Sequence, residues 1–168
     1  MIKIIATLLT IFAFSTSHAK KVNVGIILGF TGPIESLTPD MAAGAELAFS
    51  EASNSGNLLN GSKINVIRAD STCIDSAAAT SAAEGLVSQG VTAIMGADCS
   101  GVTGAILSNV AVPNGVPMIS PSATSPGLTT AEDNGLFFRT APSDARGGEV
   151  LADITADRGI TSVAITYV

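Results

Sequence analysis

The sequence predicts an α/β fold in which helices cover both faces of an open, doubly wound parallel sheet. Short apolar runs rich in β-branched residues alternate along the chain with Ala-rich segments of helical period. The stretches between successive apolar runs are long enough for the crossover helices that parallel strands require. The 168 residues suit one ordinary domain, or one part of a larger protein.

The first strand is predicted over Val22–Gly29, where the sequence VNVGIILG is almost continuously apolar. The first helix is predicted from Thr38 to Asn54, because Thr38 suits the N-cap and Pro39 suits the first helical position. The apolar residues of this helix share one face and are Met41, Ala45, Ala48, Phe49 and Ala52.

The next elements repeat this order of strand and helix. A second strand is predicted over Lys63–Asp70, because apolar and polar residues alternate there. Asp75 suits the N-cap of a helix that runs to Gln89 and ends at Gly90. A third strand is predicted over Val91–Gly96, which reads VTAIMG.

The last elements follow the same alternation. Ser100 is predicted to cap a helix that reaches Ala111. The remaining predicted elements are strands over Pro117–Ser120 and Leu136–Thr140, a helix over Asp144–Arg158, and a sixth strand over Thr161–Val168.

The first nineteen residues have the features of a secretory signal peptide. Lys3 gives a positive start, Ile4–Phe14 is an apolar core, and Ser17-His18-Ala19 matches the small-residue pattern before a cleavage site. The apolar core is too short for a membrane span, which needs about 20 residues. We therefore expect cleavage after Ala19 and a mature, exported chain of residues 20–168. This mature chain has no cysteine near its start for a lipid anchor and no apolar run that would insert in a membrane.

Composition excludes several classes of function. The formal net charge is −6, and the eight Lys and Arg residues are scattered, which argues against binding nucleic acid. His18 is the only histidine, and cleavage removes it, so the mature chain has no base for a Ser-His-Asp or Cys-His mechanism and no His for a zinc site.

Gly56–Lys63 resembles a phosphate-binding loop but has the wrong residue order and precedes a strand. No Gly-rich dinucleotide motif follows the first strand. We expect neither an enzyme nor a cofactor.

The two cysteines, Cys73 and Cys99, favour a disulfide, because cysteines of exported proteins usually pair. A bridge between them would stabilise the fold by roughly 3 kcal/mol on the chain-entropy model. Two alternatives are a pair of free thiols and a metal site. The metal site is disfavoured because two sulfurs without histidine leave the coordination incomplete.

Three loops that follow predicted strands are rich in small polar residues, and the carboxyl ends of parallel strands meet at one edge of a sheet, where ligands bind. The loops cover residues 29–33, 97–101 and 120–126. Ser100 at a helix N-terminus favours a carboxylate. The hydroxyls and carbonyls of Ser122 and Thr124 suit an ammonium group, so the set fits a small zwitterion. The structural alternative is that these residues only cap helices and close turns.

A series of landmarks relates the chain to a known family. They are Gly29 with Thr31-Gly32-Pro33, Gly44-Ala45-Glu46-Leu47-Ala48, Asp70 with Cys73, Gly96 followed by Cys99-Ser100, Ser120-Pro121-Ser122-Ala123-Thr124-Ser125-Pro126, and Phe138-Arg139-Thr140 with Asp144. In this order and with these spacings, the mature chain resembles the periplasmic leucine/isoleucine/valine-binding proteins, the branched-chain and amide amino-acid receptors of ABC transporters.

The resemblance implies a type I periplasmic-binding-protein fold of two lobes, of which residues 20–168 would form the N-terminal lobe. It implies that Ser100 holds the ligand carboxylate through its hydroxyl and N–H. The carbonyl of Ser122 and the hydroxyl of Thr124 would accept from the ammonium, with Ala123 between them in the same binding loop.

The resemblance also implies that Cys73 and Cys99 form the family disulfide. Asp98, which would lie beside the pocket, hints at a more polar ligand, and we include it among the expected ligand-binding residues. Leu37 stands where many relatives place an aromatic residue against the ligand side chain.

The function expected from the resemblance is periplasmic capture of an amino acid or amide and its delivery to an ABC transporter permease in the inner membrane. Because family members are about twice as long, we expect the second lobe to be absent from this chain. Two alternatives are a sensory ligand-binding domain of the same fold and an exported α/β enzyme. A serine hydrolase would need a Gly-x-Ser-x-Gly motif and a general base, which the mature chain lacks.

Overall fold

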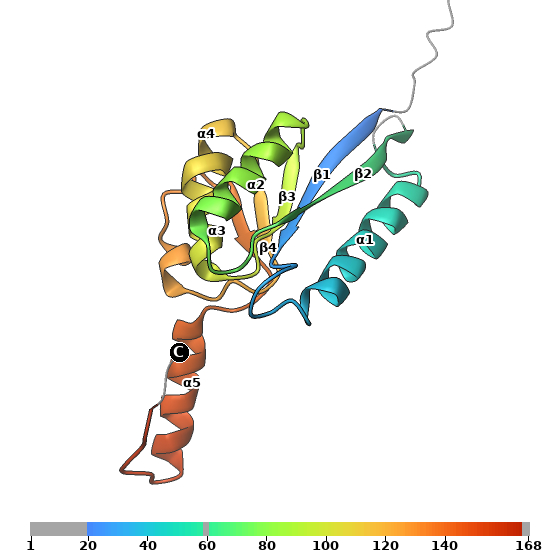
Figure 1. The fold of residues 1–168 in the computed structure, drawn as a ribbon. Helices are drawn as coiled ribbons and strands as arrows, with labels where there is room; N and C mark the ends of the chain where they lie inside the picture. Colours follow the sequence, from blue (N-terminus) through green and yellow to red (C-terminus); the bar gives the residue numbers. More distant parts are fainter. Residues whose placement is uncertain (1–19, 59–60, 166–168) are drawn as a thin grey trace, which may run out of the picture.

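The computed structural model describes residues 20–58 and 61–165 and is built around a five-stranded sheet (Figure 1). The strands are β1 (Lys21–Leu28), β2 (Lys63–Asp70), β3 (Ala93–Gly96), β4 (Met118–Ser120) and β5 (Phe137–Arg139). They lie in the order β2-β1-β3-β4-β5, and every neighbouring pair is parallel. The predicted parallel α/β sheet is confirmed. The predicted signal peptide lies outside the described residues.

Helices cover both faces of the sheet. They are α1 (Thr38–Asn54), α2 (Ser76–Ser88), α3 (Ser100–Ile106), a π-helical turn η2 (Leu107–Ala111), α4 (Val112–Asn114), a 3-10 turn η3 (Pro126–Thr129) and α5 (Asp144–Asp157). Figure 1 shows α1 on one side of the sheet, with α2 and α3 on the other. This arrangement is the doubly wound one that the sequence predicts.

The alternation of side chains along β1 explains why residues 24–28 of this strand are continuously apolar. Ile27 faces the larger core beneath α2 and α3, whereas Ile26 and Leu28 face the smaller core beneath α1. All three side chains are fully buried. A strand covered on both faces needs apolar residues at every position rather than at every second one.

Two predicted helix caps have different outcomes. Asp75 caps α2 as predicted, because its Oδ1 accepts from the amides of Ala77 and Ala78 at 2.9 and 3.0 Å. The prediction that Thr38 caps α1 is wrong, since Leu37 holds the cap position without a side-chain hydrogen bond. The hydroxyl of Thr38 is buried and donates instead to the carbonyl of Gly29 at 3.1 Å.

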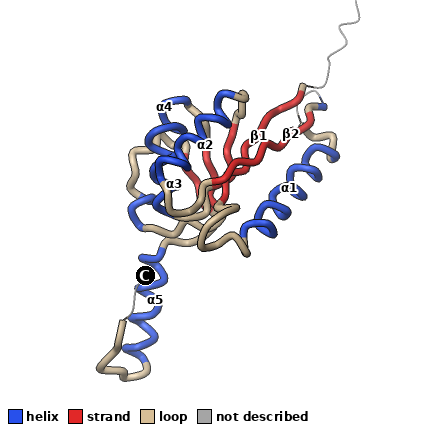
Figure 2. Tube along the Cα trace, viewed as in Figure 1, coloured by secondary structure: helices blue, strands red, loops and turns tan. Residues whose placement is uncertain are grey.

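The predicted sixth strand over Thr161–Val168 is wrong for residues 161–165, which form no strand and are exposed. The rest of that range lies outside the described residues. A strand needs a hydrogen-bonded partner, and α5 carries the chain away from the sheet before this segment begins (Figure 2). No residue of α5 is buried. Within the part of the chain that the structure describes, no helix has the length and apolar character needed to cross a bilayer.

Candidate functional site

The strand order reverses at β1, because β2 lies on one side of it and β3 on the other. The amide of Gly29, after β1, donates to Oδ2 of Asp98, after β3, at 2.7 Å. The hydroxyl of Ser71 and the amide of Cys99 donate to Oδ1 of Asp98 at 3.3 and 2.9 Å. Asp98 is only 3% exposed. Its carboxylate therefore joins the loops that follow three strands, and its contact with a ligand stays a prediction.

A disulfide reinforces the same edge. Cys73 and Cys99 are bonded, with Cα atoms 5.2 Å apart, which confirms the predicted pairing. The bridge ties the loop after β2 to the residue directly before α3. The backbone directly before Ser100 is thus held both by a covalent bond and by the hydrogen bonds of the Asp98 carboxylate.

Asp70 organises the loop that follows β1. Its carboxylate accepts from the hydroxyl of Thr31 at 2.6 Å and from the amide of Thr72 at 2.8 Å. Burial alone would raise the pKa of Asp70, but hydrogen bonds from the Thr31 hydroxyl and from the amides of Thr72, Thr31 and Phe30 outweigh burial and lower this pKa. The carboxylate therefore stays ionised and holds residues 29–33 against the loop after β2.

Ser100 does not cap α3, which corrects the prediction that it does. Cys99 holds the cap position, and Ser100 is the first helical residue. Its Oγ accepts instead from the amides of Thr124 and Ser125, each at 3.1 Å. A hydroxyl has two acceptor positions and one hydrogen. With both acceptor positions filled, Ser100 is left with a hydrogen to donate.

The hydroxyls of Ser122 and Thr124 act as hydrogen-bond donors within the protein, in contrast to the hydroxyl of Ser100. The hydroxyl of Ser122 donates to the carbonyl of Asp98 at 2.9 Å, and the hydroxyl of Thr124 donates to Oδ2 of Asp144 at 2.9 Å. Each hydroxyl has used its hydrogen and is left with lone pairs. Among residues 20–58 and 61–165, no group donates to the carbonyl oxygen of Ser122. Ala123, between them, is fully buried, and its amide donates to Oγ of Ser120 at 2.9 Å.

The three predicted loops therefore converge. The loop after β1 contacts the loop after β3 through Gly29 and Asp98, and the loop after β4 contacts it through Ser100 and Ser122. Together they form a polar edge at which, within the described residues, the hydroxyl of Ser100 can donate, and the carbonyl of Ser122 and the hydroxyl oxygens of Ser122 and Thr124 can accept.

Two residues near the loop after β4 received no role from the sequence. Arg139, the last residue of β5, donates to the carbonyls of Ser125 and Ala123 at 2.8 and 3.4 Å and to the hydroxyl of Thr129. The amide of Asp144 donates to the carbonyl of Thr124 at 3.0 Å. Both residues are among the landmarks that carry the family resemblance, so the sequence did mark them. Neither contact could be predicted from the residues next to them in the chain.

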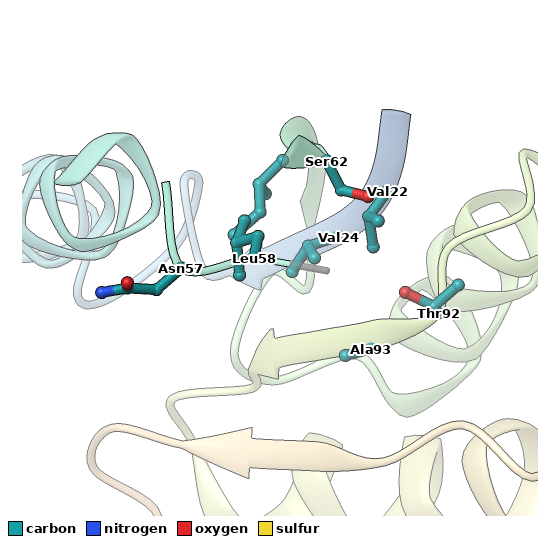
Figure 3. Close-up of a pocket in the computed structure, with 8 residues that line it drawn as sticks. Val22, Val24, Asn57, Leu58, Ser62, Thr92 and Ala93 are labelled. Atoms are coloured by element: carbon teal, nitrogen blue, oxygen red, sulfur yellow. The ribbon is translucent and has the colours of Figure 1, made fainter. Parts of the chain in front are cut away.

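Two hollows in the described surface lie away from this edge. One, of about 490 Å³, opens over the amino-terminal halves of β1, β2 and β3 and is lined chiefly by Val22, Val24, Leu58, Ile64 and Ala93 (Figure 3). The other, of about 430 Å³, lies between α5 and residues 163–165. Both are lined mostly by apolar atoms, whereas hydrogen-bonding groups from three loops meet at the edge, so the edge is the better candidate for recognition.

Comparison with protein families relates nearly the whole described chain to one of them. The model of the periplasmic binding proteins matches residues 21–168. The Leu/Ile/Val-binding protein homolog 3 of Brucella melitensis is 32% identical over 142 residues, which are 83% of this chain and 37% of that protein. The Leu/Ile/Val-binding protein BraC3 of Rhizobium johnstonii is 33% identical over 149 residues, covering 88% of this chain and 39% of that protein. The chain thus spans less than two fifths of the length of these relatives.

Solved structures of transporter binding proteins are similar too. The substrate-binding protein LivJ of Streptococcus pneumoniae, in complex with isoleucine, is 34% identical with a TM-score of 0.66, covering 74% of this chain and 35% of that one. A binding protein of Desulfitobacterium hafniense in complex with Leu is 28% identical with a TM-score of 0.70, covering 83% and 40%. A binding protein of Rhodopseudomonas palustris in complex with 3,4-dihydroxybenzoic acid is 26% identical with a TM-score of 0.71, covering 83% and 37%.

Proposed function

The chain belongs to the periplasmic binding protein family, and from this membership we propose that it is part of the substrate-binding component of an amino-acid ABC transporter. In this proposal the chain captures a small zwitterion, a branched-chain amino acid or a related amide, for delivery to a permease. The relatives that support it are named Leu/Ile/Val-binding proteins, and the solved LivJ structure is that of a transporter substrate-binding protein. No comparable observation favours a sensory domain of the same fold.

The observation that carries the proposal is which hydrogen-bond donors and acceptors Ser100, Ser122 and Thr124 leave available. Ser100 has a hydrogen to donate, which suits a carboxylate, and it lies at the start of a helical run whose dipole favours negative charge. The free lone pairs of Thr124 and the unpaired carbonyl of Ser122 suit an ammonium group. A ligand with both groups, such as an amino acid, matches this edge better than a simple acid does.

The proposed site is one wall of a cleft. Residues 20–168 would form the N-terminal lobe, and the longer relatives support a second lobe that closes over the ligand and excludes water. Residues 1–19 would be the leader that directs export, with cleavage after Ala19, and the family places such proteins in the periplasm.

The test is calorimetric titration of the natural full-length protein with four probes. They are L-leucine, L-leucinamide, 4-methylpentanoate and 3,4-dihydroxybenzoate. L-leucine should bind most tightly, because leucinamide lacks the carboxylate and 4-methylpentanoate lacks the ammonium. Tighter binding of the dihydroxybenzoate than of L-leucine would contradict the zwitterion proposal and assign the site to aromatic acids.

Variants then assign the roles of the hydroxyls. Ser100→Ala should weaken L-leucine binding by about tenfold or more, as expected for a lost hydrogen bond to a charged group. Thr124→Val should weaken L-leucine while changing 4-methylpentanoate little, because only L-leucine presents an ammonium. The matched control is Ser108→Ala, eight residues farther along the same helical run, whose exposed side chain donates to the carbonyl of Gly104 and should leave affinity unchanged.

A further inference from the structure

We propose that Arg139 is a positioning residue for ligand binding, which holds the segment from Ala123 to Thr129 in the shape that orients the hydroxyl of Ser100. The inference rests on the proposed function, since it concerns the affinity for a ligand carboxylate. Arg139 itself does not contact the ligand in this proposal.

The position of Arg139 in the sheet explains its reach. It is the last residue of β5 and pairs with Ser120, the last residue of β4, which directly precedes the binding loop. Its half-buried side chain donates to the carbonyls of Ala123 and Ser125 and to the hydroxyl of Thr129. One guanidinium thus joins three points of a seven-residue segment, which its planar, forked set of donors permits.

The peptide groups of Ser125 link Arg139 to Ser100. The amide of Ser125 donates to Oγ of Ser100 at 3.1 Å, and its carbonyl accepts from Arg139 at 2.8 Å. Ser125 is therefore held from both sides. If Arg139 releases the carbonyl, the amides of Thr124 and Ser125 lose their fixed direction, and the hydroxyl of Ser100 no longer has both acceptor positions filled.

Charge pairing does not account for Arg139. In the part of the chain that the structure describes, the ion pairs join Arg68 to Glu46 and Arg146 to Glu149, and no carboxylate pairs with Arg139. The acceptors of Arg139 are two carbonyls and a hydroxyl. Hydrogen bonds from a charged donor to such groups are strong, so the guanidinium stabilises the conformation of the loop rather than pairing with a neighbouring charge.

The experiment compares Arg139→Gln, Arg139→Lys and Thr129→Val in the natural full-length protein, with Arg158→Gln as the control. Arg158 is the C-cap residue that follows α5, is exposed, and its side chain makes no hydrogen bond to the described residues. One measurement is the hydrogen-exchange protection of the Thr124 and Ser125 amides without ligand. The other is the affinity for L-leucine at a temperature far below each melting temperature, where every variant is fully folded.

Arg139→Gln should lower the protection of both amides and weaken L-leucine binding, each by about tenfold or more. Arg139→Lys should restore little of either, because an ammonium cannot span three acceptors. Thr129→Val, which removes one of the three tethers, should give a smaller change in the same direction. Arg158→Gln should match the unmodified protein.

A purely structural role would lower the melting temperature of Arg139→Gln and leave the affinity of the folded protein unchanged, and that result would overturn the inference. Full recovery by Arg139→Lys would also overturn it, since charge rather than geometry would then matter. If the unmodified protein binds none of the four probes, the proposed function fails instead. The exchange measurement would still report whether Arg139 holds the loop.

Discussion

The amide of Gly29 donates to the carboxylate of Asp98 across the point where the strand order reverses. The two residues are 69 positions apart in the chain, so this contact depends on the assembled sheet. Together with Ser71 and Cys99, Gly29 gives the buried carboxylate three donors. The edge that would receive a ligand is therefore organised by the protein's own hydrogen bonds.

Asp98→Ala should lower the free energy of unfolding by about 2 to 4 kcal/mol, because it leaves buried donors unpaired. Asp98→Asn keeps the shape and one acceptor oxygen, so it should cost less. Asp153→Ala, on the exposed surface of α5, is the matched control and should change stability by less than about 0.5 kcal/mol. Urea titration of the purified variants measures all three. An Asp98→Ala variant as stable as the control would contradict the proposal that this carboxylate holds the loops after β1, β2 and β3 together.

Removal of the disulfide should cost about 3 to 4 kcal/mol on the chain-entropy model, because Cys73 and Cys99 are 26 positions apart. The double variant Cys73→Ser/Cys99→Ser and the reduced natural protein should therefore melt at similarly lowered temperatures. Reductant should leave the melting temperature of the double variant unchanged. A reductant effect on that variant would show that the loss has another origin.

Stability should fall in acid partly through Asp70. Its pKa is lowered in the folded protein, so its contribution is present in full above the unfolded-state pKa of about 3.9 and disappears as the pH falls through the lower folded-state value. The stability difference between the natural protein and Asp70→Asn should thus be unchanged between about pH 6 and 4 and shrink as the pH falls from about 4 to 3. Asp153→Asn is the control. A difference that stays constant over this range would refute the assignment.

Two glycines should respond oppositely to alanine. Gly96 has a φ of +129°, and a Cβ there would lie 2.0 Å from the carbonyl oxygen of Ile27. Gly96→Ala should therefore cost at least about 2 kcal/mol. Gly44, on the exposed surface of α1, has no atom within 4 Å of such a Cβ, so Gly44→Ala should stabilise by about 0.5 to 1 kcal/mol. Thermal unfolding of both variants tests the pair.

Local sequence was sufficient where the structure itself is local. The apolar run of β1, the alternation of β2 and the cap at Asp75 each follow from neighbours within a few residues, and the structure confirms them. The convergence of three loops followed from a general property of parallel sheets.

Predictions that treated a hydroxyl as a local group were wrong. Thr38 and Ser100 both suit helix caps, yet their hydroxyls bond to Gly29, nine residues earlier, and to Thr124 and Ser125 in another loop. The predicted strand at residues 161–165 was wrong for a related reason, since β-branched residues pair only where a strand edge lies within reach. Arg139 was missed because its contacts depend on how the loop after β4 folds back beside the end of β5, where the carbonyl of Ser125 accepts from Arg139.

The order β2-β1-β3-β4-β5 also affects how the sheet assembles in time. Once β1, β2 and β3 have paired, β4 docks at the open side of β3 and β5 at the open side of β4, each beside the strand made just before it. A chain that is synthesised from its N-terminus can therefore extend the sheet strand by strand, and no later strand has to separate two strands that are already paired. In such sequential growth the open edges of β3 and of β4 are each covered by the next strand along the chain, which limits how long these two edges are exposed to aggregation.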